Sequence, residues 1–263
     1  MKTYNRTHIF IKTFTVLTLF ILILTISCSS HKRRGTISPE EDFHRAMEKF
    51  DRGKYLDAME ALTIITLNYS GSSIIDSAQY YLGESHYRMK EYIIAASEFQ
   101  RLVNQYPSSP LVDEAKYKVG MSYLKLSPGY GLDQEFTYKC VDEFQEFTEY
   151  FPQSDLVPEV MESIYKARSK IAKKIFKSGE LYFKMRDYES ALIYLKSVLD
   201  YYYDTDYAPA SLLLMGESYF KMKQPVEGER AMLKLVEKYP DSPEAEKAST
   251  FLNPAQVDSE FPQ

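Results

Sequence analysis

The sequence predicts an all-α fold, a superhelical stack of five helical hairpins. The first observation is a repeat, in which a small residue with similar neighbours returns at three equal steps of 37 residues and one longer step, at Ala46, Gly83, Gly120, Gly179 and Gly216. The second observation is composition. The 263 residues include 23 Tyr and 15 Phe but only 10 Gly, which favours helices with aromatic packing over a β fold with many turns.

Residues 1–27 are predicted to be an export signal peptide. Basic residues precede an uncharged apolar run at 14–26, which has the length of a signal-peptide core and is short for a membrane span. Ser27 and Cys28 follow this run and resemble a bacterial lipobox, in which the cysteine is acylated and becomes the first mature residue. A lipid on Cys28 would hold the chain on a membrane, with residues 28–38 as a tether. A secreted protein cut elsewhere and an uncleaved anchor are the alternatives.

The repeat domain is predicted to span residues 39–252. Its first helix is expected to start at Ser38-Pro39, because this pair provides an N-cap and a proline at the first helical position. Ser242-Pro243 is expected to start the last helix in the same way. Residues 253–263 are polar and lack periodicity, so they are predicted to be a tail.

Units one, two and four place an aromatic residue and a second small residue at fixed distances after their anchors. In the second unit these are Tyr92 and Ala95, and a Tyr-Pro pair at 106–107 closes the unit. This spacing resembles the tetratricopeptide repeat, a helical hairpin that buries its apolar face only by stacking on its neighbours.

The third unit departs from this register. An insertion near residues 125–137 lengthens the connection between its two helices, and a loop tolerates such extra length. Apolar residues within 153–178 predict longer helices in units three and four. Cys140 occupies the second small-residue position, so we expect it to be buried and free of a disulfide.

No enzymatic activity, metal or cofactor is expected. Gly-Glu-Ser occurs at 83–85 and again at 216–218, but a nucleophile elbow needs a glycine two residues after the serine, where Tyr87 and Phe220 stand. The histidines lack metal-ligand spacing. A net charge of −5 without an arginine-rich stripe argues against nucleic-acid binding.

One face of the predicted first helices is nearly all aromatic. Positions three before and four after each anchor are seven residues apart and therefore share a helical face. The candidates for a peptide groove on this face, with one arginine to meet a peptide carboxylate, are Phe43, Phe50, Tyr80, Tyr87, Arg88 and Tyr117. The alternative is that the rings pack between neighbouring units and that the arginine belongs to a solvated edge.

Several stretches resemble the BamD family, also known as ComL or YfiO, of lipoproteins in the β-barrel assembly machine. The stretches are the run LDQEFT at 132–137, the unit-four sequence at 166–205, and Tyr-Pro-x-Ser closures at 106–109 and 239–242. The layout of five units with an insertion in the third adds to the resemblance.

The resemblance implies an outer-membrane lipoprotein that faces the periplasm and is held by its lipid. Its C-terminal units would bind a BamA-like barrel protein, and its N-terminal units would bind aromatic-ended targeting strands of unfolded outer membrane proteins. Other lipoproteins of the machine would be further partners. The alternative function is a periplasmic repeat lipoprotein of the Tol-associated type that coordinates cell-wall or envelope processes.

Overall fold

The computed structural model describes residues 38–252. Over this range the chain forms eleven α-helices and no strand. The predicted signal peptide, the lipidation candidate Cys28, the tether up to residue 37 and the polar tail lie outside the described residues. The helices are α2 Pro39–Asp51, α3 Tyr55–Asn68, α4 Ile75–Arg88, α5 Tyr92–Gln105, α6 Val112–Leu126, α7 Glu135–Tyr150, α8 Val157–Lys184, α9 Tyr188–Tyr201, α10 Tyr207–Lys221, α11 Pro225–Lys238 and α12 Pro243–Phe251.

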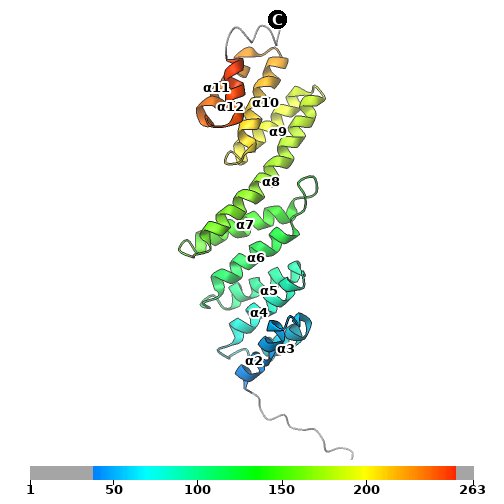
Figure 1. Ribbon diagram of the computed structural model, residues 1–263, viewed down its shortest axis with the longest axis vertical. Coiled ribbons are helices and arrows are strands. Elements are labelled where there is room, and N and C mark those ends of the chain that lie inside the picture. Colours follow the sequence, from blue (N-terminus) through cyan, green and yellow to red (C-terminus); the bar gives the residue numbers. More distant parts are fainter. Residues whose placement is uncertain (1–37, 253–263) are drawn as a thin grey trace, which may run out of the picture. The chain divides into compact units, whose positions relative to one another are not determined.

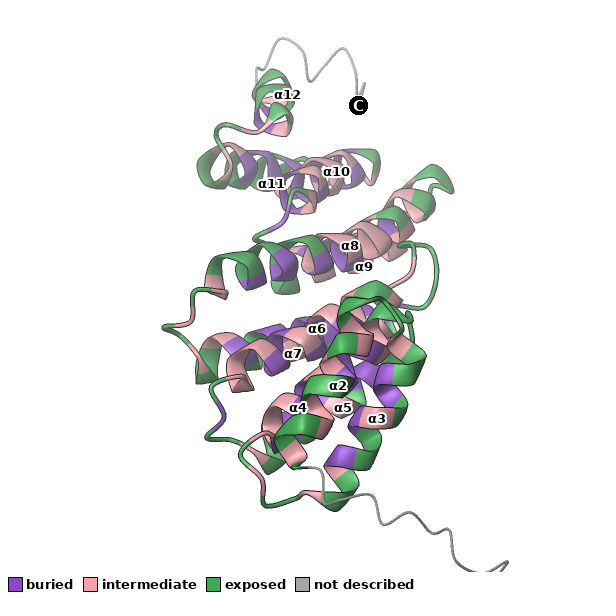
Figure 2. Ribbon diagram, turned by 60° about the horizontal axis from the view of Figure 1, so that its bottom comes forward, coloured by how far each residue is buried: buried purple, intermediate pink, exposed green. Residues whose placement is uncertain are grey.

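The helices follow one another as five hairpins and a closing helix (Figure 1). Hairpin one is α2 and α3, hairpin two is α4 and α5, and so on to hairpin five, α10 and α11. From α3 onward each helix contacts the next, within one compact unit that begins at Asp42. Buried residues lie where neighbouring helices face one another, and the turns are mostly exposed (Figure 2). The predicted all-α stack of five hairpins is therefore confirmed for the described part of the chain.

The anchor residues of the repeat lie where the two helices of a hairpin cross. A Cβ atom added to Gly83 would be 2.9 Å from the ring of Phe99, and one added to Gly120 would come still closer to Phe144. Real Cβ atoms do not approach so closely, so glycine is needed for these two helix pairs to close around a large buried side chain. The buried side chains at the equivalent position of the second helices are Leu62, Phe99, Phe144, Leu195 and Met232.

The Tyr-Pro-x-Ser closures are hydrogen-bonded turns between hairpins. In the turn after hairpin two, the Ser109 amide donates to the Tyr106 carbonyl at 2.9 Å. The Ser109 hydroxyl donates to Asp76, at the start of α4, at 2.6 Å. Ser154 repeats this contact one hairpin later, donating to Asp113 at 2.8 Å. In hairpins two and three this serine therefore ties the start of the first helix to the turn after the second helix, whereas Ser242 after hairpin five donates to the Tyr239 carbonyl.

Four of the five turns inside the hairpins contain one residue in the left-handed region. The φ angles are 72° at Gly53, 63° at Lys90, 65° at Arg186 and 59° at Lys223. Glycine adopts this conformation without steric cost, but a residue with a Cβ atom is strained there. Three of the four hairpins therefore carry local backbone strain at equivalent positions.

Replacing Lys90 with glycine is expected to raise the free energy of unfolding by about 1 kcal/mol, because the strain at positive φ is relieved. Urea denaturation followed by circular dichroism measures the change. Lys54→Gly is the matched control, because Lys54 ends the equivalent turn of hairpin one at a φ of −84°. The control should be neutral or destabilising, and a gain of equal size in both variants would contradict the argument.

The connection between α6 and α7 and the helix that follows α7 both depart from the repeat. Residues 127–134 join α6 to α7, within the stretch where the register places the insertion. The predicted helix extension falls on one helix, α8, which has 28 residues, and not on the helices of both units. The first half of α8 packs on α7, and its second half pairs with α9.

Cys140 lies on α7 and is fully buried as a free thiol, as predicted. Burial raises the pKa of this thiol to about 12, although the positive charge of Lys170 acts in the opposite direction. The thiol is therefore protonated at neutral pH and serves as a small apolar residue in the core.

Candidate functional site

Two of the predicted groove residues, Tyr80 and Tyr117, lie in the core between hairpins. Their side chains are 5% and 8% exposed. The Tyr80 hydroxyl donates to Glu114 on α6, and the Tyr117 hydroxyl donates to Glu159 on α8. Burial and these hydrogen bonds raise both tyrosine pKa values well above the ordinary range. The packing interpretation accounts for these two rings, since each links one first helix to the next.

Phe43 and Phe50 lie on α2 and are half-buried. Both rings lie beside Tyr81 of hairpin two, with centroids 6.1 and 5.2 Å from its own, and Phe50 also contacts Tyr55 at 5.3 Å. These aromatic contacts join hairpins one and two and leave part of each ring exposed. Tyr81 was not among the sequence candidates, although it directly follows Tyr80.

The remaining two candidates, Tyr87 and Arg88, belong to a charged cluster at the end of α4. Glu84 is only 5% exposed and accepts hydrogen bonds from Arg88 at 2.7 Å and from Lys118 of α6 at 2.9 Å. The Lys118 ammonium also lies 5.1 Å from the centre of the Tyr87 ring. Two cations thus share one buried carboxylate, so the cluster has a net positive charge at neutral pH.

This cluster offers a neutral aromatic ring beside an exposed cation. Burial raises the pKa of Tyr87 to about 12, so its hydroxyl stays protonated. The hydrogen bond to Glu84 raises the pKa of Arg88, whose side chain is 54% exposed. A guanidinium fixed on one side by a carboxylate still has donors for a second, incoming carboxylate. The arrangement suits a ligand that combines an apolar or aromatic group with a negative charge.

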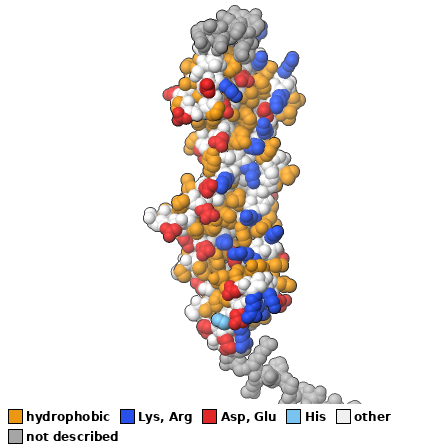
Figure 3. Space-filling model, in the orientation of Figure 1, with side chains coloured by type: hydrophobic (Ala, Val, Ile, Leu, Met, Phe, Trp, Pro, Cys, Tyr) orange, Lys and Arg blue, Asp and Glu red, His pale blue; other side chains and the backbone are white. Residues whose placement is uncertain are grey.

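Sequence reasoning missed Glu84 and Lys118 as members of this cluster. Their signal was available, because Glu84 directly follows one anchor glycine and Lys118 lies two residues before the next. Opposite charges at these two repeat positions predict an ion pair between first helices. On the drawn face of the molecule, Lys and Arg side chains recur along the right-hand part, with hydrophobic side chains between them (Figure 3).

The described helices include none that is both long enough and apolar enough to span a lipid bilayer. The same residues contain no group of three or more His, Cys, Asp or Glu side chains arranged to hold a metal ion.

Comparison with solved structures finds tetratricopeptide-repeat proteins. The TPR2AB domain of yeast Sti1, in its complex with pHSP90, is 14% identical, with 84% of each chain covered and a TM-score of 0.42. The P58(IPK) TPR domain is 18% identical over 84% of this chain and 57% of that chain, with a TM-score of 0.43. A thermophilic TPR protein of Thermus thermophilus is 14% identical over 82% of this chain and 99% of that chain, with a TM-score of 0.35.

No curated protein sequence matches the chain. The family model named YfiO, described as an outer membrane lipoprotein, matches residues 36–233, which is well over half of the sequence. This match confirms the resemblance drawn from the repeat, the insertion and the closures. The chain belongs to the YfiO family of outer membrane lipoproteins.

Proposed function

We propose that the chain is a non-enzymatic scaffold of the β-barrel assembly machine, anchored by lipid on Cys28 and facing the periplasm. Membership in the YfiO family supports the place in outer membrane assembly. The sequence around Cys28 supports the anchor, and mass spectrometry of the mature N-terminus tests it. A first mature residue other than an acylated Cys28 would overturn the anchor.

The first helices of hairpins one to three bind the targeting strands of unfolded outer membrane proteins. The observation that carries this proposal is the cluster in which buried Glu84 holds Arg88 and Lys118 next to the Tyr87 ring. A strand that ends in an aromatic residue presents a ring and a terminal carboxylate side by side. The ring packs on Tyr87 and the carboxylate pairs with Arg88. The partly exposed rings of Phe43 and Phe50, on the first helix of the adjacent hairpin, extend this aromatic surface.

Arg88→Ala is expected to weaken binding of a synthetic peptide that ends in phenylalanine by about tenfold, the effect of one lost charge-assisted contact. Fluorescence anisotropy of a labelled peptide measures the affinity. The loss should vanish when the C-terminus of the peptide is amidated, because the carboxylate that Arg88 recognises is then absent. Tyr87→Ala should weaken the binding of both the carboxylate peptide and the amidated peptide.

The matched control is Arg101→Ala. Arg101 lies on α5 of the same hairpin, is 47% exposed and also pairs with a glutamate, Glu98. It should leave affinity unchanged. If Arg88→Ala keeps native helicity and still binds the carboxylate peptide as well as the unmodified protein does, strand binding at this cluster is excluded.

The C-terminal hairpins bind a BamA-type barrel protein, and other lipoproteins of the machine join the same complex. Copurification from detergent-solubilised membranes tests this part of the proposal. Recovery of the barrel protein supports it. Recovery of only cell-wall or Tol components would replace it with a role in envelope coordination.

A further inference from the structure

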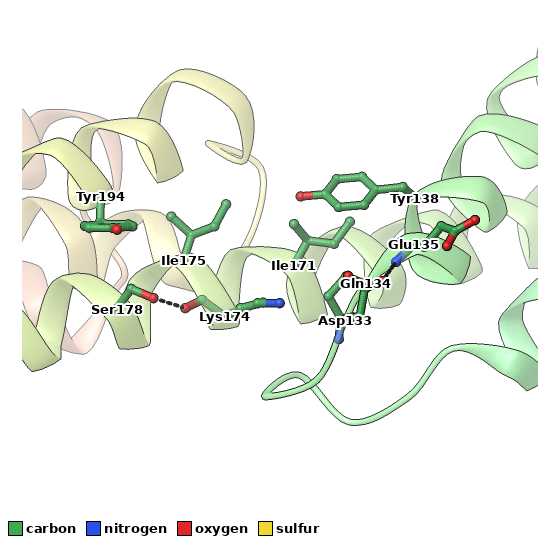
Figure 4. A pocket seen from close by; sticks show the side chains of 9 residues that line it. All are labelled: Asp133, Gln134, Glu135, Tyr138, Ile171, Lys174, Ile175, Ser178 and Tyr194. Carbon is green, nitrogen blue, oxygen red and sulfur yellow. Dashed lines mark hydrogen bonds between the residues drawn. The ribbon is translucent and has the colours of Figure 1, made fainter.

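A cleft of about 420 Å³ lies between α7, the connection at 127–134, α8 and α9. In Figure 4, Ile171 and Ile175 lie between the rings of Tyr138 and Tyr194, with Lys174 and Ser178 along one rim. Tyr138 is 46% exposed, so part of its ring faces the opening. The cleft therefore has an apolar and aromatic interior, and the Lys174 ammonium and the carboxylates of Asp133 and Glu135 are among the groups that line it.

The length of α8 explains why the cleft exists. Its first half packs on α7 through Ile164, Ala167 and Ile171, and its second half pairs with α9, where Gly179 faces Leu195. The second helix of hairpin four is thereby displaced along α8 from the second helix of hairpin three. The Tyr194 ring is stacked on Tyr182 at 5.3 Å, which fixes the α9 side of the opening.

Three lysines of α8 hold the connection at 127–134. The Lys170 ammonium lies 2.8 Å from the Ser127 hydroxyl, the Lys173 ammonium lies 4.5 Å from the centre of the Tyr130 ring, and the Lys174 ammonium lies 2.7 Å from the Leu132 carbonyl. Among the described residues, none of the three lysines forms an ion pair with a carboxylate. Three positive charges within two helical turns thus have only neutral partners.

The acidic groups at the start of α7 do not neutralise these lysines. Asp133 accepts a hydrogen bond from the Glu135 amide at 2.8 Å, and the Glu135 side chain pairs with Lys139 at 2.7 Å. Each lysine ammonium has three donors, and the contacts described above use only some of them. Among the described residues Asp133 has no ion-pair partner, so one negative charge stands against the three of Lys170, Lys173 and Lys174, and this edge keeps a net positive charge.

We propose that this cleft docks an acidic segment of a partner protein. The segment places one aliphatic or aromatic side chain between Tyr138 and Tyr194, and its carboxylates pair with Lys173 and Lys174. The apolar interior favours a protein segment over a free anion, because a phosphate would leave Ile175 and the rings of Tyr138 and Tyr194 without an apolar partner. The inference rests on the proposed scaffold function and adds a second binding site, distinct from the cluster at Arg88.

The test uses the full mature chain and the purified periplasmic region of the BamA-type barrel protein from the same organism. Two variants are compared by calorimetry. Lys173→Glu with Lys174→Glu reverses the charge at the edge, and Ser178→Phe fills the cleft while all three lysines stay unchanged. Each is expected to weaken binding about tenfold or more. The control is Lys54→Glu with Lys90→Glu, which makes the same charge change at two exposed positions of hairpins one and two and should have no effect.

Photo-crosslinking in cells from a benzophenone side chain at position 138 gives an independent readout. The expected product joins position 138 to an acidic segment, identified by mass spectrometry, and a benzophenone at exposed Ile193 should not form it. If the barrel protein binds but neither variant weakens it and no such product forms, the docking cleft is wrong and the scaffold function stands. If the unmodified chain does not bind the barrel protein, that partner is wrong, and the crosslinked product alone decides the cleft.

Discussion

Phe144→Ala is expected to lower the free energy of unfolding by about 3–5 kcal/mol, the range for a large aromatic side chain removed from a core. Phe144 is fully buried on α7, and its ring lies 6.0 Å from that of Tyr117. On α6 its ring faces Gly120, which has no side chain that can move into the space. The cavity therefore persists, and chemical denaturation followed by circular dichroism measures its cost.

The control for this variant is Tyr150→Ala on the same helix. Tyr150 is 71% exposed, so its removal should change stability by no more than about 0.5 kcal/mol. A loss at Phe144 as small as the loss at Tyr150 would mean that α6 and α7 do not depend on their crossing for stability. The pairing of a glycine with a large side chain would then have no structural role.

The hairpin crossings could be predicted from the sequence because they depend on residue size at fixed spacing. The residue at each anchor position must be small because a large side chain of the second helix packs against it, and the same requirement acts in every repeat. The helix start at Pro243 was predictable for a local reason as well, because Ser242 accepts a hydrogen bond from the Ala245 amide. Helix capping and the small residue at each crossing can therefore both be read from the sequence.

The role of the aromatic face could not be settled in the same way. A ring that packs between hairpins and a ring that lines a groove satisfy the same spacing, so Tyr80 and Tyr87 look alike in the sequence. They differ in what the next hairpin provides. Glu114 accepts a hydrogen bond from Tyr80 and closes over it, but Lys118 lies over the ring of Tyr87 and leaves it half-exposed.

Buried charge was equally hidden, because a lysine on a helix with acidic neighbours is usually solvated. Lys116 is only 4% exposed, and its partners Glu143 and Glu146 come from the next helix. The third-hairpin insertion separates these residues further in sequence than the ordinary repeat would. Even when the repeat is aligned to allow for the insertion, the alignment predicts which positions face each other. It does not predict that Lys116 is buried.

Changing Glu143 and Glu146 together to glutamine is expected to lower the free energy of unfolding by about 3 kcal/mol, because it leaves the Lys116 ammonium buried without a counter-charge. In the unmodified protein this ammonium lies 2.6 Å from a carboxylate oxygen of each glutamate. Burial by itself lowers the pKa of Lys116, but the hydrogen bonds and charges of the two glutamates outweigh it and raise that pKa. Urea denaturation at neutral pH measures the loss.

Two further measurements separate buried charge from lost packing. Adding Lys116→Met to the glutamine pair removes the charge and should restore most of the stability, whereas a packing defect would persist.

The effect of alkaline pH on stability has opposite signs in the unmodified protein and in the glutamine variant. The raised pKa of Lys116 stabilises the unmodified protein below its unfolded value of about 10.4, and this contribution is lost as pH rises through the folded value. In the glutamine variant burial is unopposed, so the deficit should shrink as alkaline pH removes the proton. A deficit that Lys116→Met does not relieve and that stays constant with pH would show that Lys116 is not a buried charge.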